Sequence, residues 1–401
     1  MVTLTMKEQL KLEVIQKVMD KQIDIVKAGN VLGLTDRSIY RLLSRVRDKG
    51  IKAVIHGNNG NKHACKIDEK SRKRIVGLAT GKYKGFNDRH FQEKLLEDEG
   101  LQINRESLRQ ILRESGIKAK QKRRGRKYRR YRDRKEAIGV MLQIDASCHD
   151  WLESRGPVMT IVGAIDDASG EAWARFERSE STWAYLRLMK QITKDKGLPL
   201  SIYSDRHTIF HSPKEASIMD QLEGRDFRTQ FGRAMDELGI KIIKAYSPQA
   251  KGRIERLWGT FQDRLIAEMR LAEIKNIDEA NRFLPGFLKD YNRKFCKKPK
   301  THIVAFRKSP KSKELDRILC LKKDRTVAKD HTIKFHGLLL QIPPSRKWAS
   351  ISGQRVTVLQ HSDGSVEIMY KKQIVARFPY ESIKRIVKKC GFADNHILLA
   401  A

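Results

Sequence analysis

Three acidic residues stand where the sequence predicts that carboxylates can meet. Asp145 follows the apolar run at residues 140–144, and Asp205 follows a second run at residues 200–204. Each run predicts a buried strand with an acid near its carboxyl end, the edge at which open α/β sheets place their sites. Glu255 lies on a predicted helix. Three converging carboxylates would attract hard divalent cations.

The helix that carries Glu255 is predicted from Ser247 to Leu265. Ser247 is a suitable N-cap, and Pro248 fits the first turn. Glu255 lies about 100° from Ile254 and so at the edge of the buried stripe, where it can lean into a cleft. The alternative is a solvated acid in ion pairs with its neighbours. The stripe consists of Ile254, Leu257, Trp258, Phe261 and Leu265, and basic residues that could meet phosphates are Lys251, Arg253 and Arg256.

Other candidate acids and histidines fit structural roles better. The run from Asp166 to Gly170 is a ready turn, so Asp166 and Asp167 are interpreted as structural. His207 and His211 could touch a phosphate or a metal, but surface polar residues are the favoured interpretation. The remaining acids match no motif or lie in a polar insertion at residues 211–228: Asp220, Asp226 and Glu237.

The charge of the chain predicts a polyanionic partner. The 401 residues contain 83 Lys plus Arg against 48 Asp plus Glu, a net charge of +35, and length alone predicts several domains. Nucleic acid is the first expectation, and an anionic membrane surface is the alternative. No apolar segment long enough to span a bilayer and no signal peptide is evident. Five scattered cysteines without a CxxC pair argue against a zinc knuckle or disulfide framework and favour a reducing cytosol.

Residues 4–50 are predicted to form three helices, of which the last two fit a helix-turn-helix. Gly33 supplies the turn, Thr35 is the N-cap, and a helix follows over residues 36–48. In this arrangement the second helix enters the major groove of DNA. A three-helix bundle with a solvated basic face is the alternative. The outer side of the helix carries Arg37, Ser38, Arg41, Arg45 and Arg47.

A second helical group follows a polar break at residues 56–61. Helices are expected over residues 68–79, 87–99 and 104–115, with Asn87 and Asn104 as caps. The last helix presents three arginines at four-residue spacing and fits a second helix-turn-helix. These arginines are Arg105, Arg109 and Arg113.

A strongly basic segment joins the helical groups to the rest of the chain. Twelve of the eighteen residues at 118–135 are basic, so the segment is expected to be extended until it neutralises phosphates. A solvated linker is the alternative. Its candidate DNA contacts are Lys122, Arg123, Arg124, Arg126, Lys127, Arg129 and Arg130.

Residues 138–295 alternate strand and helix patterns, and residues beyond 299 are rich in strands. The first part predicts a mixed sheet covered by helices, with the Asp145 strand in the centre. The second part contains the Asp-Gly turn of a hairpin at residues 361–364. Strands are expected at residues 158–166, 171–178, 240–245, 331–341, 355–360, 365–370 and 373–378, and helices at 182–194, 230–238 and from 380.

Three motifs carry a resemblance to a known family. Residues 143–147 (QIDAS), 203–210 (YSDRHTIF) and 247–257 (SPQAKGRIERL) resemble the motifs of DDE transposases with a retroviral-integrase-like core, most closely the ISNCY group of insertion sequences. The resemblance implies an RNase H-like fold for residues 138–295 and catalytic and metal-binding roles for Asp145, Asp205 and Glu255. The step from Asp205 to Glu255, 50 residues, exceeds the family's familiar spacing of roughly thirty-five, and the insertion accounts for the excess at little cost in stability.

The sequence patterns predict helix-turn-helix domains at 1–55 and 64–117, a basic linker at 118–137 and a tail at 381–401. The resemblance implies the integrase-like core at 138–295 and a small SH3-like β-barrel at 315–380. It predicts a prokaryotic DNA transposase of the cytoplasm and nucleoid, a homo-oligomer on DNA. Two Mg²⁺ ions, or Mn²⁺, about 3.5–4 Å apart would serve cleavage of the 3′ ends and their transfer to target DNA. A DNA-binding regulator without chemistry and an RNase H-type nuclease are the alternatives.

Overall fold

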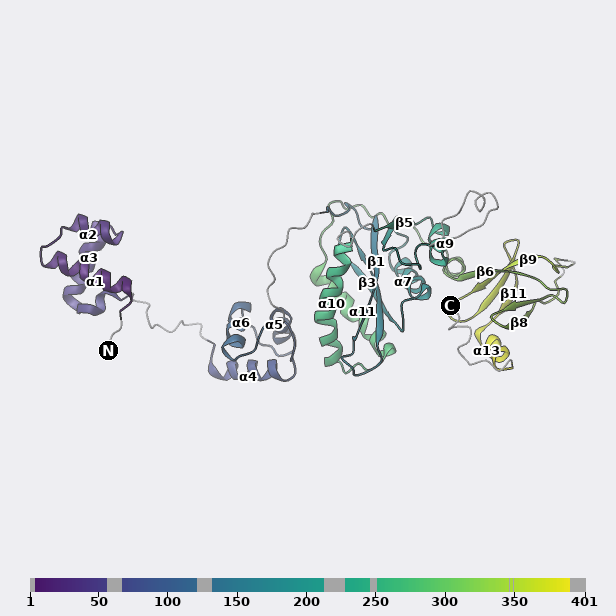
Figure 1. Cartoon of the computed structure of the whole chain (residues 1–401), viewed down its shortest axis with the longest axis horizontal. Helices are drawn as coiled ribbons and strands as arrows, with labels where there is room; N and C mark the ends of the chain where they lie inside the picture. The colour runs from purple at the N-terminus through teal and green to yellow at the C-terminus, as the bar shows by residue number, and fades with distance from the viewer. Residues whose placement is uncertain are drawn as a thin grey trace. The chain divides into compact units, whose positions relative to one another are not determined.

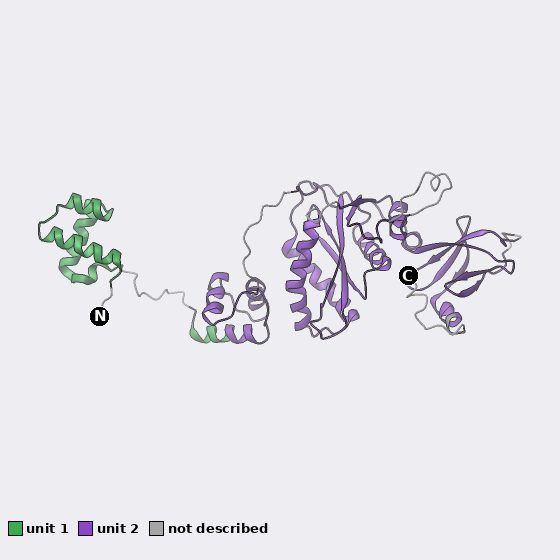
Figure 2. Ribbon diagram, in the orientation of Figure 1, with its two compact units in different colours: residues 1–75 green, residues 76–401 purple. Residues whose placement is uncertain are grey.

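The computed structural model describes residues 4–55, 67–120, 132–212, 228–245, 251–345, 347–348 and 350–389. The chain divides into two compact units, residues 1–75 and 76–401 (Figure 2). Among the described residues, no helix is both long enough and apolar enough to cross a bilayer.

The first unit contains the three predicted helices, α1 (Met6–Met19), α2 (Ile25–Leu32) and α3 (Asp36–Lys49), followed by a short 3-10 turn, η1 (Gly50–Val54) (Figure 1). Gly33 ends α2 in the left-handed region at φ 63°, which glycine adopts without steric cost. The helices enclose a small core of Val14, Ile15, Ala28, Ile39, Leu42, Leu43 and Val54.

The second helical group consists of α4 (Glu69–Thr80), α5 (Asp88–Glu97) and α6 (Arg105–Glu114). The predicted caps are confirmed, because Asn87 accepts a hydrogen bond from the His90 N–H and Asn104 accepts one from the Glu106 N–H. Each cap satisfies a backbone donor that the helix leaves free. The unit boundary falls within α4.

A five-stranded mixed sheet follows, and it has the predicted strand at its centre. Its order is β3-β2-β1-β4-β5, with β1 antiparallel to β2 and parallel to β4. Strand β1 continues to His149, five residues beyond the apolar run at 140–144, so Asp145 lies within the strand and not at its end. The strands are β1 (Met141–His149), β2 (Met159–Asp166), β3 (Ala172–Glu177), β4 (Ser201–Ser204) and β5 (Lys241–Lys244).

Helices cover the two faces of this sheet (Figure 1). Helices α7 (Thr182–Asp195) and α9 (Gln230–Glu237) pack on one face, where β1 contributes Leu142 and Ile144. Helices α10 (Gly252–Leu271) and α11 (Ile277–Phe295) pack on the other. Because side chains alternate along a strand, the odd-numbered residues of β1 face α10.

The C-terminal part is rich in strands as predicted, but its described sheets are open. Strands β9, β10 and β11 pair in the order β11-β10-β9-β6, and β7 and β8 form a separate hairpin. Strand β6 was not predicted, because only Leu321 in it is buried. The elements are α12 (Ser312–Ile318), β6 (Leu321–Thr326), β7 (Thr332–Phe335), β8 (Leu338–Gln341), β9 (Arg355–Gln360), β10 (Val366–Tyr370), β11 (Gln373–Phe378) and α13 (Tyr380–Lys389).

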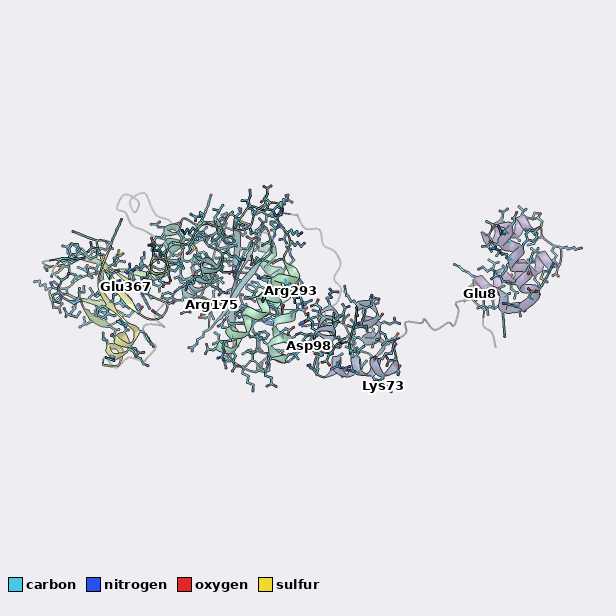
Figure 3. The ribbon with its side chains drawn as sticks, turned by 180° about the vertical axis from the view of Figure 1, so that it is seen from behind. Glu8, Lys73, Asp98, Arg175, Arg293 and Glu367 are labelled. Carbon is cyan, nitrogen blue, oxygen red and sulfur yellow. The ribbon has the colours of Figure 1, made fainter. Side chains whose placement is uncertain are left out.

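One carboxylate ties this sheet to the helix before it. Glu367 of β10, labelled in Figure 3, forms ion pairs with Arg317 of α12 at 2.9 Å and with Arg377 of β11 at 3.1 Å. The SH3-like barrel remains a prediction, since no sheet among the described strands closes on itself.

Candidate catalytic site

Asp145 and Asp205 lie on neighbouring parallel strands and face the same side of the sheet. The last paired residues of β1 and β4 are Gln143 and Tyr203, and each aspartate stands two residues further on. Residues two apart in a strand share a face, so Asp145 projects toward the side covered by α10. The contact that both carboxylates make with Lys251 places Asp205 on the same side. Asp205 lies just beyond the end of β4 and accepts a hydrogen bond from the His207 N–H at 3.0 Å.

A single ammonium group bridges the two aspartates. Lys251 Nζ lies 2.8 Å from Asp145 Oδ1 and 3.4 Å from Asp205 Oδ2. The lysine side chain is only 9% exposed, while those of Asp145 and Asp205 are 22% and 46% exposed. Two carboxylates that share one cation in a partly desolvated position form a site for positive charge. The sequence predicts a phosphate contact for Lys251 and gives no indication of its contact with the two aspartates.

Trp258 fixes the second oxygen of Asp145. Its indole Nε1 donates a hydrogen bond to Asp145 Oδ2 at 3.2 Å. The indole fits because Gly163, which pairs with Asp145 across the sheet, has no side chain: a Cβ there would lie 2.6 Å from Trp258 Cη2. Trp258 was predicted as part of the buried stripe, but nothing in the sequence indicated the role of Gly163.

Glu255 lies in the first turn of α10 and its side chain is exposed. It precedes Trp258 by three residues, so these two residues share one side of the helix, and it follows the N-cap residue Lys251 by four. Lys251 and Trp258 both contact Asp145, and Glu255 therefore stands on the side that faces the aspartates. Within the described ranges, no group of three or more His, Cys, Asp and Glu side chains is close enough to hold one metal ion. The residue predicted as the N-cap, Ser247, lies outside the described residues, and α10 runs on to Leu271.

The two histidines near the site do not add to this cluster. The ring of His207 is exposed and accepts a hydrogen bond from the Ile209 N–H. His211 Nε2 lies 3.4 Å from Ser204 Oγ, and burial lowers the pKa of its imidazole. His207 fits the interpretation as a surface polar residue, whereas His211 is half-buried.

The predicted DNA contacts fall into three groups. Arg37, Arg41, Arg45, Arg105, Arg109 and Arg256 are exposed, and Ser38 is half-buried. Arg113 is half-buried and pairs with Asp88, and Lys251 and Arg253 are buried at 7% and 8% exposure. The contacts proposed between Lys122 and Arg130 lie outside the described residues.

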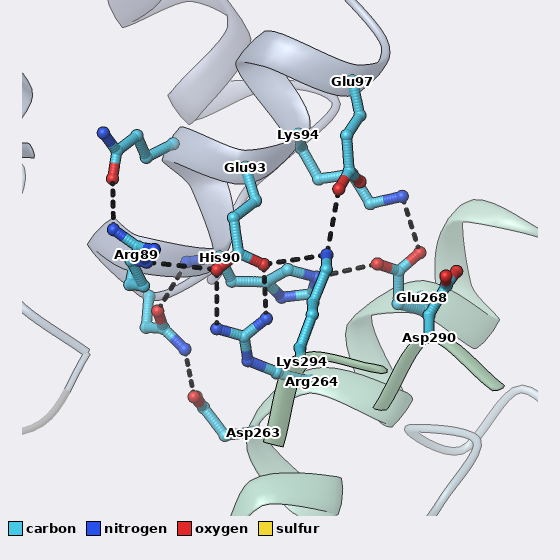
Figure 4. Close-up of polar contacts among 12 residues, drawn as sticks. Arg89, His90, Glu93, Lys94, Glu97, Asp263, Arg264, Glu268, Asp290 and Lys294 are labelled. Carbon is cyan, nitrogen blue, oxygen red and sulfur yellow. Dashed lines mark hydrogen bonds and ion pairs between the residues drawn. The ribbon is translucent and has the colours of Figure 1, made fainter. Parts of the chain in front are cut away.

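The helix that carries Glu255 also contacts the second helical group. His90 Nε2 of α5 lies 2.7 Å from Glu268 Oε1 of α10, and Arg264 donates to Glu93 at 2.7 Å (Figure 4). Lys294 of α11 joins the same cluster through Glu93 at 3.0 Å. A cavity of about 500 Å³ lies beside these residues, between α5, α10 and α11. None of these contacts was predicted, because the partners are far apart in the sequence.

The central part of the chain is thus a five-stranded mixed sheet of the order β3-β2-β1-β4-β5, with two aspartates around the Lys251 ammonium on its α10 face. An integrase core domain family matches residues 237–295. "Putative transposase y4bF" of Sinorhizobium fredii is 34% identical over 375 residues, 92% of this chain and 80% of that protein. "Transposase for insertion sequence IS1202" of Streptococcus pneumoniae is 32% identical over 398 residues, 90% of this chain and 84% of that protein.

The chain therefore belongs to the family of insertion-sequence transposases with an integrase core, and it is an enzyme of that type. The narrower resemblance to the ISNCY group stays a prediction. Among solved structures, the catalytic core domain of HTLV-2 integrase in complex with magnesium, in its dimeric form, is 16% identical with a TM-score of 0.27. The match covers 36% of this chain and 83% of the HTLV-2 integrase chain.

Proposed function

We propose that this transposase binds the terminal inverted repeats of an insertion sequence, cleaves the 3′ ends and joins them to target DNA. The observation that carries the proposal is the position of Lys251 Nζ, within 3.4 Å of both Asp145 and Asp205. An ammonium at that point stands in for a metal cation. It supports the assignment of the two aspartates, with Glu255 on the facing side of α10, as metal ligands.

The donor set fits divalent magnesium or manganese. Carboxylate oxygens are the ligands that Mg²⁺ prefers, and Asp145 and Asp205 already share one positive charge. Two Mg²⁺ ions, when bound, would activate the attacking oxygen and stabilise the leaving oxygen of an in-line displacement at phosphorus. Asp145 and Asp205 would hold the cations, and Trp258 would keep Asp145 in one orientation. Lys251 would withdraw from between the acids as they load.

The other parts of the chain would hold DNA. Helices α3 and α6 carry exposed arginines and are proposed as the recognition helices of two helix-turn-helix domains, at residues 1–55 and 64–117. The linker at 118–137 would neutralise backbone phosphates, and the β-rich part at 315–380 would contact DNA or a second protomer. We further propose a homo-oligomer on DNA in the cytoplasm, associated with the nucleoid.

Two other functions would each require only one of these features, either the DNA-binding helices or the acidic residues. A regulator that binds the repeats without cutting them would need the helical groups but not the arrangement of Lys251, Asp145 and Asp205. A nuclease of the RNase H type would need the acids but not two groups of DNA-reading helices. The combination of both features favours the transposase.

Substitution of the acids tests the proposal. Asp205→Asn and Glu255→Gln keep the size of each side chain and remove the charge that would hold Mg²⁺. Cleavage of labelled end DNA should fall by at least about a thousandfold, while binding to the terminal repeat should persist. Removal of divalent metal from the unmodified protein should have the same effect.

Glu237→Gln is the control, because Glu237 pairs with Arg233 and Lys322 away from the aspartates. This variant should cut at close to the normal rate. Normal cleavage by Glu255→Gln would refute the third ligand, and an unmodified protein that binds but never cuts would favour the regulator.

A further inference from the structure

Asp167 is a fully buried carboxylate that gathers donors from three separate segments. It lies in the turn after β2, and its side chain is 0% exposed. It accepts hydrogen bonds from Gln143 Nε2 at 2.8 Å, from the Lys135 N–H at 2.9 Å and from Arg253 Nη1 at 2.9 Å. Arg132 completes the set. A carboxylate removed from water is stable only when it is paired in this way.

Two of these donors stand two residues before a proposed catalytic acid. Gln143 precedes Asp145 on β1, and Arg253 precedes Glu255 on α10. Asp167 therefore holds the strand of one acid and the helix of another through a single group. The sequence suggests only a turn for Asp167, because its partners are distant along the chain.

The amide of Gln143 adds a second connection between strand and helix. Its nitrogen donates to Asp167, and its Oε1 accepts the backbone N–H of Ile254 at 3.3 Å. That N–H belongs to the first turn of α10, where the helix itself supplies no acceptor. Gln143 is fully buried, so both of its polar ends depend on these partners.

The end of the basic linker belongs to the same network. Arg253 Nη2 donates to the Arg132 carbonyl oxygen at 3.2 Å, and Arg134 Nη1 donates to the Ala168 carbonyl oxygen at 2.9 Å. Burial lowers the pKa of Arg253, and the charge of Asp167 opposes that effect. The start of α10 is thus fixed both to the sheet and to residues 132–135.

We propose that Asp167, with Gln143 and Arg253, is a positioning group that sets the separation between the strand of Asp145 and the helix of Glu255. The proposal rests on the proposed catalytic role of the three acids. Asp167 is fully buried, and its carboxylate accepts hydrogen bonds from Arg132, Lys135, Gln143 and Arg253. It acts through Gln143 and Arg253. Residues that orient metal ligands in this way typically change metal affinity by about 10–100-fold when they are replaced.

The test is Arg253→Lys in the full-length chain, compared with Arg264→Lys. Both arginines lie on α10, both are 8% exposed, and each pairs with a carboxylate, Asp167 and Glu93 respectively. A lysine keeps the charge and loses the planar fork in each case. Both variants should therefore lose a similar amount of thermal stability.

Of the two arginine variants, only Arg253→Lys should weaken metal binding. We expect its Mn²⁺ dissociation constant, from electron paramagnetic resonance, and the Mg²⁺ concentration for half-maximal cleavage to rise about tenfold. Arg264→Lys should leave both values unchanged. Gln143→Met, which keeps the volume of a buried side chain and removes both amide contacts, should act in the same direction as Arg253→Lys.

Three outcomes would overturn the positioning role: unchanged metal affinity in Arg253→Lys, unchanged metal affinity in Gln143→Met, or an equal change in Arg264→Lys. Glu255→Gln separates this failure from failure of the proposed function. If Glu255→Gln is inactive and Arg253→Lys binds metal normally, only the positioning role is wrong. If Glu255→Gln cuts normally, the catalytic assignment itself fails.

Discussion

Lys251 pairs with both Asp145 and Asp205, and under the proposed mechanism it supplies the positive charge that a bound metal would replace. Its removal should therefore destabilise the metal-free protein by about 1–3 kcal/mol, because two partly buried carboxylates lose their shared partner. In Lys251→Met we expect a lower melting temperature in chelator and a larger Mg²⁺-dependent rise than in the unmodified chain. Differential scanning calorimetry at several Mg²⁺ concentrations measures both quantities.

Lys322→Met is the matched control for this prediction. Lys322 is 17% exposed and pairs with Glu237, which is not among the proposed ligands. The Lys322→Met variant should have a lower melting temperature than the unmodified chain, but the same Mg²⁺-dependent rise in melting temperature. An equal Mg²⁺ effect in the two variants would contradict the role of Lys251 as the cation that metal replaces.

At the residue scale, the sequence predicted the acids but not the groups that hold them. Asp145 and Asp205 could be selected as candidate ligands because each follows an apolar run, which is a local pattern; their catalytic role stays a prediction. Trp258 was correctly predicted as buried, whereas its hydrogen bond to Asp145 depends on Gly163 in a different strand. Contacts between distant elements leave no periodic signal in the sequence. The sequence therefore indicates only a basic surface for Lys251 and a turn for Asp167, and not the partners that either residue contacts.

At the scale of the elements, helix α5 contacts α10 and α11 through titratable groups whose pKa values are all lowered in the folded protein: His90, Glu93 and Glu268. Burial raises the pKa of Glu93, yet hydrogen bonds from Arg264 and Lys294 outweigh it and lower the value from 4.5 to about 2. Burial lowers the pKa of His90 from 6.5, although Glu268 opposes it. Burial raises the pKa of Glu268, but the hydrogen bonds and charges of His90 and Lys94 outweigh burial and lower this pKa.

The contact of α5 should therefore weaken as the pH falls. A separated α5 would take up a proton at His90 below about pH 6.5 and at Glu93 between about pH 4.5 and 2, while the docked helix resists both. Hydrogen exchange of the α5 amides, corrected for intrinsic rates, should show decreasing protection over this range. Glu93→Gln should reduce protection already at pH 7, whereas Glu106→Gln, an exposed acid of α6, should not. Constant protection from pH 7 to 4 would argue against the contact.

The exposed arginines of α3 allow a direct test of sequence reading. Arg41→Ala with Arg45→Ala should reduce the preference for terminal-repeat over scrambled DNA by at least about tenfold, since a good base contact contributes about 1–3 kcal/mol. Lys7→Ala with Lys17→Ala removes the same charge from exposed positions of α1. That pair should weaken binding to both duplexes equally in a salt titration. If both double variants behave alike, α3 contributes charge and no recognition.

Element order was more predictable than element ends. The helices α1 to α6 and the central place of β1 followed from apolar periodicity and caps, which are local signals. Strand β6 was missed because it is mostly polar, and α10 continued past the predicted end because its second half packs against both the core and α5. Closure of the C-terminal sheet into the predicted β-barrel depends on pairing between strands that are distant in the sequence, and a local sequence pattern does not predict such pairing.

At the scale of the whole molecule, one chain offers one set of proposed metal ligands, whereas an element has two ends. We therefore expect at least two protomers in the complex that joins both ends in concert. Mass measurement or crosslinking of the full chain on paired end DNA, with Asp205→Asn to stop the reaction, should give a multimer. A monomer of the unmodified chain that completes joining of both ends in a parallel reaction would contradict this expectation. The net charge of +35 should make assembly strongly dependent on salt, since each neutralised phosphate releases counterions.

Helix α10 carries three features at fixed positions along its axis. Glu255 lies near its start, the buried apolar stripe runs through its middle, and Glu268, which contacts His90, lies near its end. A single inserted residue between Glu255 and Glu268 would rotate everything after it by about 100° and shift it by about 1.5 Å. The apolar stripe would then leave the core, or the contacts with α5 would be lost. Natural variation within this family is thus free to exchange side chains along α10 but constrained from changing its length, so gain and loss of residues should collect in the connections between elements.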